Sequence, residues 1–222
     1  MKAYVESLEA EFKDNQNPKI ALEQKAYMRN QFEFYGIKTP IRRAVQKPFL
    51  DKQFLPKKEK LNDIVYELWN KPQRELQLFT QELVFCYSKK MEKNDIELLE
   101  YMVTQKSWWD TVDFIATKPM GEYFKVYKEE RYHRVNQWLA SENIWLQRCA
   151  VLFQLKYKKD LDTELLSYVI THLLGSKEFF INKAIGWALR EYSKTNLQWV
   201  IDFASKTKLS PLSKREALRL IE

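Results

Sequence analysis

The 222-residue chain contains little glycine, cysteine or histidine, with 4, 2 and 2 residues respectively. Sheet folds and phosphate-binding loops need glycine where the backbone turns through positive φ. Four glycines are too few for a β-sandwich, a barrel or a Rossmann-type sheet. The sequence also lacks any run of about 18 uncharged apolar residues, so no membrane span is expected. These absences leave α-helix as the main structural element.

The few cysteines and histidines also narrow the chemistry. Cys86 and Cys149 have no Cys or His partner at metal-ligand spacing, so we expect two buried, reduced thiols of a cytoplasmic protein. His133 and His172 lie in unrelated contexts, which argues against a zinc site and against a Ser-His-Asp hydrolase. The sequence therefore predicts no metal and no cofactor.

The residues that are abundant favour an ordered helical protein. Hydrophobic residues make up 45% and charged residues 30% of the chain, which is enough apolar surface to offset the entropy of ordering. The opening segment, MKAYVESLEAEF, has the acids and periodicity of a helix rather than of a signal peptide. We therefore expect one all-α domain spanning residues 1–222.

The net charge is +7, from 37 basic and 30 acidic residues. Residues 1–60 carry 13 basic and 8 acidic residues, and residues 141–222 carry 13 and 9, whereas residues 61–140 carry 11 and 13. A curved fold could bring both basic ends onto one polyanion, as nucleic-acid binding requires. The alternative is that the charge only aids solubility.

A helix start recurs about every 35 residues. Ser107, Ser141 and Ser176 each open an apolar-periodic segment, and serine is a favoured N-cap. A fourth start lies at Lys71-Pro72, where proline suits the first helical position. A shift of 35 residues aligns Trp145 with Phe180, Arg148 with Lys183, Tyr157 with Tyr192 and Lys159 with Lys194.

Further apolar-periodic stretches lie between these starts, at residues 94–103, 161–174 and 196–205. Each repeat is then a helix pair, and stacked pairs make a HEAT-like α-α superhelix. Such pairs need few residues of positive φ, which fits the low glycine content. Ser213 to Glu216 reads as a capping box for a last helix that reaches Glu222, which suggests a truncated C-terminus. An accidental repeat among ordinary helices is the alternative.

Two residues after Ser107 are not explained by folding. Trp108, Val112 and Ile115 form a core stripe, and Asp110 lies where it would complete a capping box. Trp109 and Asp113 form an i, i+4 pair on the adjoining face, and Asp113 lies beyond the first turn, where capping has no use for it. The pair suits stabilisation of an electron-poor centre. The alternative is a boundary tryptophan beside a solvated carboxylate.

The helix after Ser176 carries a similar second stripe. Its core positions are Ile181, Ala184, Ile185, Ala188 and Tyr192. The neighbouring stripe is Lys183, Trp187, Arg190 and Lys194, which suits phosphates and one flat group. A protein-interface patch is the alternative. Further basic and aromatic residues are Tyr27, Arg29, Arg42, Arg43, Arg148 and the run Lys156 to Lys159.

These segments together resemble the DNA alkylation repair (AlkD-like) family of HEAT-repeat DNA glycosylases. The resemblance runs from residues 27–43 to 210–217, and its most specific motifs are SWWDTVD (107–113), NIWLQRCAVLFQLKYK (143–158) and SKEFFINKAIGWALREYSKTN (176–196). It implies an α-α superhelix with a concave basic face for duplex DNA. It also implies excision of N3- and N7-alkylated purines, chiefly 3-methyladenine and 7-methylguanine, in base excision repair.

The resemblance also implies roles for individual residues. Asp113 would be the catalytic carboxylate, and Trp109 and Trp187 would pack around the lesion deoxyribose. The expected partner is double-stranded DNA with alkylated bases, bound by a monomer with no membrane contact. The expected DNA-binding residues are Tyr27, Arg43, Arg148, Lys156, Lys183, Arg190 and Lys194.

The residue types agree with that chemistry. A cationic alkylpurine has a weakened glycosidic bond, so its departure needs little acid catalysis, and no second catalytic carboxylate or histidine is evident. A carboxylate and tryptophan faces would stabilise the oxocarbenium-like sugar. Two alternatives stay open: a non-catalytic α-solenoid that binds DNA structure or damage, and a protein-binding solenoid.

Overall fold

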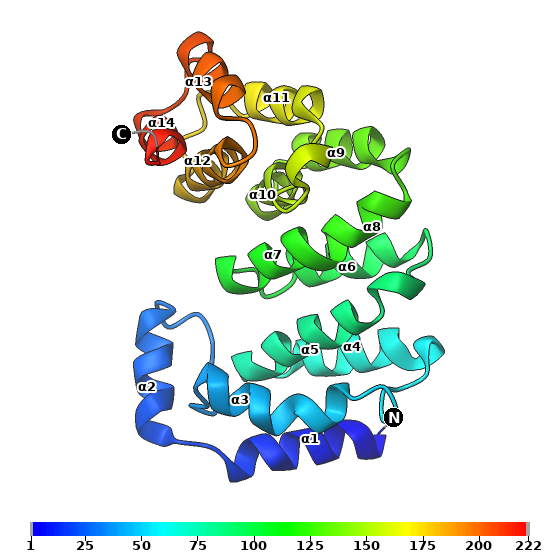
Figure 1. Ribbon diagram of the computed structural model, residues 1–222. Helices are drawn as coiled ribbons and strands as arrows, with labels where there is room; N and C mark the ends of the chain where they lie inside the picture. The colour runs from blue at the N-terminus through cyan, green and yellow to red at the C-terminus, as the bar shows by residue number, and fades with distance from the viewer. Residues whose placement is uncertain (1, 221–222) are drawn as a thin grey trace. The chain divides into compact units, whose positions relative to one another are not determined.

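The computed structural model describes residues 2–220, and in that range the protein consists of fourteen α-helices and short 3-10 or π turns (Figure 1). No strand forms among these residues; Glu33 and Gln73 make one isolated bridge. The all-α prediction is confirmed. No helix in residues 2–220 has the length and apolarity to cross a membrane.

A repeat of 35 residues is present. Helices α3 (Thr39–Gln46), α5 (Arg74–Cys86), α7 (Trp109–Ile115), α10 (Ile144–Leu152) and α12 (Phe179–Ser193) begin 35 residues apart in succession. The expected partner helices are α6 (Asp95–Thr104), α11 (Thr163–His172) and α13 (Leu197–Lys206). The remaining helices are α1 (Lys2–Asp14), α2 (Pro18–Tyr27), α4 (Leu61–Asn70), α8 (Gly121–Val126), α9 (Glu130–Ala140) and α14 (Pro211–Leu218).

The prediction of serine N-caps at Ser107, Ser141 and Ser176 was wrong, because the first residue of each following helix lies two or three residues after the serine. The N-cap residues are Trp108, Asn143 and Glu178, and of these only Asn143 caps with its side chain, accepting from the N–H groups of Trp145 and Leu146. The Ser107 hydroxyl instead donates to the Val103 carbonyl at 2.6 Å. Ser141 likewise donates back, to Trp138. These serines end the preceding turn rather than begin the next helix.

Two other helix starts also differ from the prediction. The N-cap of α5 is Gln73, so Pro72 lies before the helix and not at its first position. The N-cap of α14 is Ser210, whose hydroxyl oxygen accepts from the N–H of Ser213 at 3.1 Å. Pro211 follows at the first helical position, which suits its fixed φ. Ser213 and Glu216 therefore lie inside the helix, and Glu222 lies outside the described residues.

Positive φ is more frequent than the glycine content suggests. Gly36 and Gly175 adopt it, but so do five residues with side chains: Arg29, Asn30, Lys106, Glu142 and Lys158. Left-handed backbone costs a residue with a Cβ about 1–2 kcal/mol. The shortage of glycine therefore does not reflect a lack of left-handed positions.

The chain divides into two compact units, Met1–Lys90 and Met91–Glu222; the single domain of residues 1–222 stays a prediction.

In the first unit, the Glu75 carboxylate accepts from the N–H groups of Tyr35, Gly36 and Ile37 at 2.9–3.1 Å. Gly36 has φ +88, and a Cβ there would lie 2.0 Å from the Asn17 carbonyl oxygen. Only glycine fits this contact between α2 and the turn before α3.

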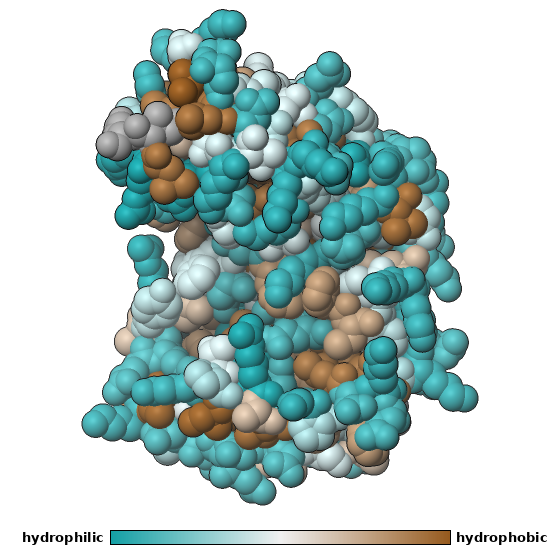
Figure 2. Space-filling view, viewed as in Figure 1, coloured by the Kyte–Doolittle hydropathy of each residue, from teal (hydrophilic) through white to brown (hydrophobic). Residues whose placement is uncertain are grey.

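The second unit buries the apolar stripes of α7, α10 and α12. Val112 and Ile115 are fully buried, and the expected core residues Ile181, Ala184, Ile185, Ala188 and Tyr192 are all buried. On the face shown in Figure 2, hydrophilic residues cover most of the surface and apolar residues form small, separate patches. The core stripes predicted from the sequence are confirmed except at Trp108, which precedes α7 and is half-buried.

The cysteines differ in exposure. Cys149 is buried and Cys86 is exposed, so the prediction of two buried thiols was wrong for Cys86. Burial, and secondarily Asp113, raise the pKa of the Cys149 thiol, which makes this thiol a poor nucleophile. No group of metal-ligating side chains occurs in residues 2–220.

Candidate active site

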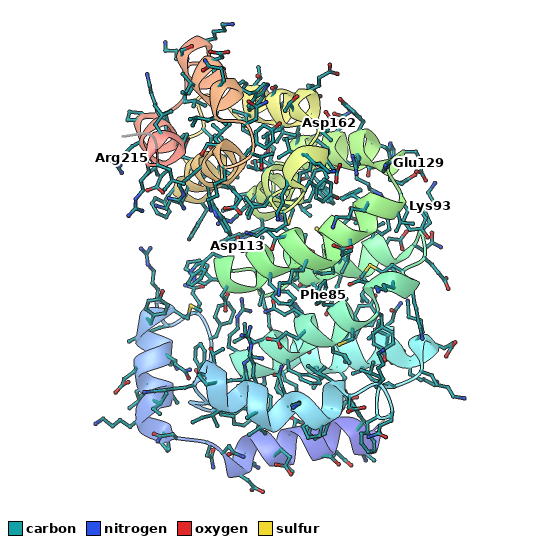
Figure 3. The ribbon with its side chains drawn as sticks, viewed as in Figure 1. Phe85, Lys93, Asp113, Glu129, Asp162 and Arg215 are labelled. Atoms are coloured by element: carbon teal, nitrogen blue, oxygen red, sulfur yellow. The ribbon has the colours of Figure 1, made fainter. Side chains whose placement is uncertain are left out.

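Asp113 lies on α7, on the side of the helix that faces α10 (Figure 3). Helix α7 covers only two turns and continues into a π turn, Ala116–Met120, that contains Pro119. The Thr117 hydroxyl donates to the Asp113 carbonyl at 2.6 Å and ties the end of α7 to this turn. The backbone that carries Asp113 is therefore fixed on the C-terminal side as well.

The Asp113 carboxylate is held by two hydrogen bonds from one guanidinium. Arg148 Nε donates to Oδ1 at 2.6 Å and Nη2 donates to Oδ2 at 2.8 Å. This is the fork-to-fork geometry that makes arginine–carboxylate pairs both strong and directional. The side chains are 19% exposed for Asp113 and 5% for Arg148, so the carboxylate has only limited contact with water.

Arg148 also connects α10 to α12. Its Nη1 donates to the Phe180 carbonyl in the first turn of α12, and its guanidinium lies 5.9 Å from the centre of the Phe180 ring. All three guanidinium nitrogens thus have acceptors inside the second unit. In this arrangement Arg148 joins α7, α10 and α12, and as a contact to the DNA backbone it stays a prediction.

Burial raises the pKa of Asp113 above its ordinary value of 3.8. The hydrogen bonds and the charge of Arg148 oppose this rise, and the nearby Asp110 adds to it. Desolvation penalises the carboxylate anion, while the guanidinium stabilises it. The site thus holds a negative charge where the surroundings solvate it poorly, and such a charge interacts strongly with any cation brought beside it.

Three aromatic rings pack next to this pair. Trp108, Trp145 and Phe180 have ring centroids 4.9–5.8 Å apart in all three combinations. Trp145 and Phe180 are the residues that the 35-residue shift aligns, so the repeat stacks equivalent positions on one another. The Trp108 indole nitrogen is buried and has no hydrogen-bond partner among residues 2–220. This cluster supports the first turns of α10 and α12, where Arg148 makes its contacts.

Trp109 and Trp187 are both half-buried, on α7 and α12 respectively. Trp109 begins the helix that carries Asp113 one turn later. Trp187 lies between Lys183 and Arg190 on the second stripe of α12, as the sequence predicted. The convergence of both rings on Asp113 stays a prediction.

Two cations of this stripe, Lys183 and Arg190, are ion-paired with Glu216, which the sequence pattern places in a capping box. Glu216 of α14 accepts from Lys183 Nζ at 2.7 Å and from Arg190 Nη1 at 2.8 Å. Its side chain is 8% exposed, and these hydrogen bonds lower its pKa. No sequence signal pointed to Glu216, because the contact depends on how closely α14 packs against α12.

Lys156 and Lys194, two further residues predicted to bind DNA, share a second carboxylate. Glu191 accepts from Lys156 at 3.0 Å and from Lys194 at 2.6 Å. Lys194 follows Glu191 by three residues on α12, a spacing that could have identified this pair from the sequence. The pairing of Glu191 with Lys156 joins two repeats, and spacing along one helix does not predict it. Four of the seven predicted DNA-binding residues thus surround two glutamates.

Two predicted residues lie in the first unit. Tyr27 ends α2 and its side chain is 72% exposed. Arg43 on α3 is 59% exposed, with Nε 3.5 Å from Glu82, while the neighbouring Arg42 is buried and donates to Glu82 at 2.9 Å. Arg43 therefore presents its charge to solvent, whereas Arg42 is part of the folded interior.

The comparisons with known proteins agree with this architecture. The family model described as DNA alkylation repair enzyme matches residues 8–221. A solved structure described as a predicted DNA alkylation repair enzyme from Enterococcus faecalis is 35% identical, with a TM-score of 0.86, over 92% of this chain and 96% of that one. No curated protein matches the chain significantly.

The likeness to that structure confirms the predicted fold class, an α-α superhelical repeat fold. The family match covers the helices that carry Asp113, Arg148 and Trp187. With nearly the whole sequence matched and a 35% identical structural neighbour, the chain belongs to the DNA alkylation repair enzyme family.

Proposed function

We propose that the protein is a monofunctional DNA glycosylase that removes positively charged N3- and N7-alkylated purines, such as 3-methyladenine and 7-methylguanine, from duplex DNA. The observation that carries this proposal is the Asp113 carboxylate, gripped at both oxygens by Arg148 in a largely desolvated position. A fixed anion of this kind suits stabilisation of a cation that exists only during the reaction.

The reaction needs an anion more than an acid. The bond between sugar C1′ and the purine nitrogen breaks, and its electron pair goes to the base, which neutralises the positive charge of the alkylated ring. The sugar becomes oxocarbenium-like, and the Asp113 carboxylate stabilises it, with Trp109 and Trp187 contributing their ring faces. A water molecule then adds to C1′ and loses a proton, which leaves an abasic site.

Arg148 acts in this proposal chiefly by positioning. Its two donors set the orientation of the Asp113 carboxylate and its third donor fixes that arrangement to α12. A lysine could supply the charge but not the fork of donors.

The proposed DNA-contacting cations are Lys156, Lys183, Arg190 and Lys194 in the second unit, with Tyr27 and Arg43 in the first. Glu191 and Glu216 each hold two of the cations in the second unit, so a phosphate would replace or share an existing partner. Binding by a monomer in the cytoplasm belongs to the same proposal.

The test is release of 7-methylguanine from alkylated duplex DNA by the wild type and by Asp113→Asn. We expect the substitution to lower the single-turnover rate about 10²- to 10³-fold, the scale of losing one electrostatic stabiliser. Circular dichroism and duplex binding should stay close to wild type. Equal release by both proteins would contradict the role of Asp113. A wild type that binds duplex but releases no base would instead favour the non-catalytic DNA-binding solenoid.

A further inference from the structure

A second cationic site lies in the second unit, away from Asp113. A cavity of about 490 Å³ opens at the residues that follow α10, with α8 and the start of α9 on its other side. Glu129, which directly follows Lys128, lies across this unit from Asp113 in the view of Figure 3. The lining residues are Lys125, Lys128, Arg131, Lys156, Tyr157, Lys158, Lys159 and Asp160.

The floor of the cavity holds its arginine in place. The buried Tyr157 donates its hydroxyl to the Gly121 carbonyl at 2.6 Å. Lys125 Nζ and the Arg131 guanidinium carbon lie 5.4 and 5.3 Å from the centre of the Tyr157 ring, which is cation–π distance. Arg131 Nε also donates to the Phe124 carbonyl at 2.9 Å. The guanidinium is thus anchored at Nε and on one face.

Most of the positive charge here is not neutralised. Lys125 pairs with Glu122 and Lys156 pairs with Glu191. Lys128, Arg131, Lys158 and Lys159 form no ion pair with any carboxylate in residues 2–220, and the lining contains one acid, Asp160. The cations beside Asp113 and along α12 pair with Asp113, Glu191 or Glu216, whereas these four cations around one opening have no carboxylate partner in residues 2–220.

The backbone at the cavity adds donors. Tyr157 has φ −76 and ψ −19, and Lys158 follows with φ +53. A right-handed residue followed by a left-handed one forms a concave nest of N–H groups that suits an anion. The N–H groups of Lys158 and Lys159 donate to no acceptor in the described part of the chain. Left-handed backbone is unfavourable for Lys158, whereas a glycine in this turn would adopt it without that cost.

The helix dipole does not account for these lysines. Cations stabilise the C-terminal end of a helix only within about its last turn. Helix α10 ends at Leu152, and the lysines begin four residues later at Lys156. The repeat gives a better account, because Tyr157 and Lys159 are equivalent to Tyr192 and Lys194, and a second cavity of about 320 Å³ lies beside the latter pair.

The two cavities share Lys156 and Lys158 in their linings. Cations thus continue from Lys194, through Lys156 and Lys158, to Lys159 and Arg131. We propose that the cavity after α10 binds a backbone phosphate of the DNA, distant from the damaged nucleotide, through Arg131, Lys128, Lys158 and Lys159. The inference relies on the proposed function for its ligand, duplex DNA, and not for base excision.

The experiment measures the affinity for undamaged duplex DNA at several salt concentrations. The variants are Lys128→Ala, Lys159→Ala and their combination, because both side chains are exposed and their loss leaves the core intact. Each single variant should bind about two- to fivefold more weakly. The slope of log affinity against log salt should become shallower by about 0.9 for each lost contact. Lys13→Ala, an exposed lysine of α1, is the matched loss of one charge and should leave the slope unchanged.

Two results would overturn the proposal. A double variant with the affinity and slope of the Lys13→Ala control would show that the cavity does not contact DNA. Tight binding of inorganic pyrophosphate that Lys128→Ala/Lys159→Ala abolishes, with duplex binding unchanged, would assign the site to free phosphates instead. Base release by the wild type is measured separately. If the wild type releases base and the double variant binds duplex DNA normally, only the cavity proposal is rejected. If the wild type releases no base and the double variant binds duplex DNA more weakly, only the glycosylase proposal is rejected.

Discussion

Around Asp113, one carboxylate faces one guanidinium inside the protein, whereas beside α12 Glu191 and Glu216 are each shared by two cations that are partly exposed. The Asp113–Arg148 pair uses two parallel hydrogen bonds between largely buried groups. Glu191, in contrast, lies between Lys156 and Lys194, whose side chains are more than half exposed. Glu216 is intermediate, a buried carboxylate with two partly exposed partners.

The same chemical pairing therefore serves two purposes. A buried pair is costly to break, because the partner left behind has neither water nor a counter-ion, so it fixes geometry. An exposed pair contributes about 0–1 kcal/mol, so its cations can leave the glutamate for a phosphate at little cost. The second unit thus contains one rigid anion and, separately, cations that are held less tightly.

The largest expected effect is on the buried pair. Arg148→Met should lower the free energy of unfolding by about 3–5 kcal/mol, because it leaves the Asp113 carboxylate and the Phe180 carbonyl without their donor. Urea denaturation at pH 7 measures this. Adding Asp113→Asn to Arg148→Met should recover part of the loss, since no buried charge then remains. A loss below 1 kcal/mol in the single variant would mean that the pair is exposed after all.

A smaller effect is expected where α14 brings Glu216 to α12. A Cβ on Gly186 would lie 2.4 Å from Cβ of Glu216 and 3.0 Å from the Ser213 carbonyl oxygen. Gly186→Ala should therefore push the helices apart and cost about 1–3 kcal/mol, measured by thermal unfolding. At Gly175, a Cβ would meet nothing within 4 Å, and φ is +85. Gly175→Ala should cost only the backbone strain, about 1–2 kcal/mol. A Gly186→Ala variant as stable as the wild type would refute the close packing.

The smallest effect is a difference in pH dependence between the two carboxylates. The pKa of Glu216 is lowered from 4.5, so its stabilisation is complete above pH 4.5 and is lost as the pH falls through the folded-state pKa. The pKa of Asp113 is raised from 3.8, so stability declines as the pH rises from 3.8 through the folded-state pKa.

Unfolding measurements from pH 3 to pH 7 test these two signs. Glu216→Gln should lower stability by roughly 1 kcal/mol at pH 7 and by less at pH 3. Asp113→Asn should differ from the wild type by more at pH 7 than at pH 3, with its relative stability rising as the pH rises. If the stability of both variants relative to the wild type changed in the same direction as the pH rises, the contrast between the two carboxylates would be contradicted.

Part of the candidate site could be predicted from the sequence, because it depends on the spacing of residues within one helix. Trp109 and Asp113 share a helix face by their spacing of four, and Lys183, Trp187, Arg190 and Lys194 share another. The caps could not be read so well. Ser107, Ser141 and Ser176 have the residue type of an N-cap, but the hydroxyls of Ser107 and Ser141 donate to the preceding turn, and that of Ser176 accepts from the N–H of Glu178, the residue before α12. Local preference alone does not distinguish these outcomes.

The sequence by itself determined the helical class, the 35-residue repeat, the core stripes and the unusual face that carries Asp113, because each depends on periodicity within one element or one repeat. Only the tertiary structure decided which groups meet. Arg148 reaches Asp113 across 35 residues, Glu216 reaches Arg190 across 26, and Lys158 joins Arg131 at one cavity. Packing distances between helices set these contacts, and a linear pattern does not encode them.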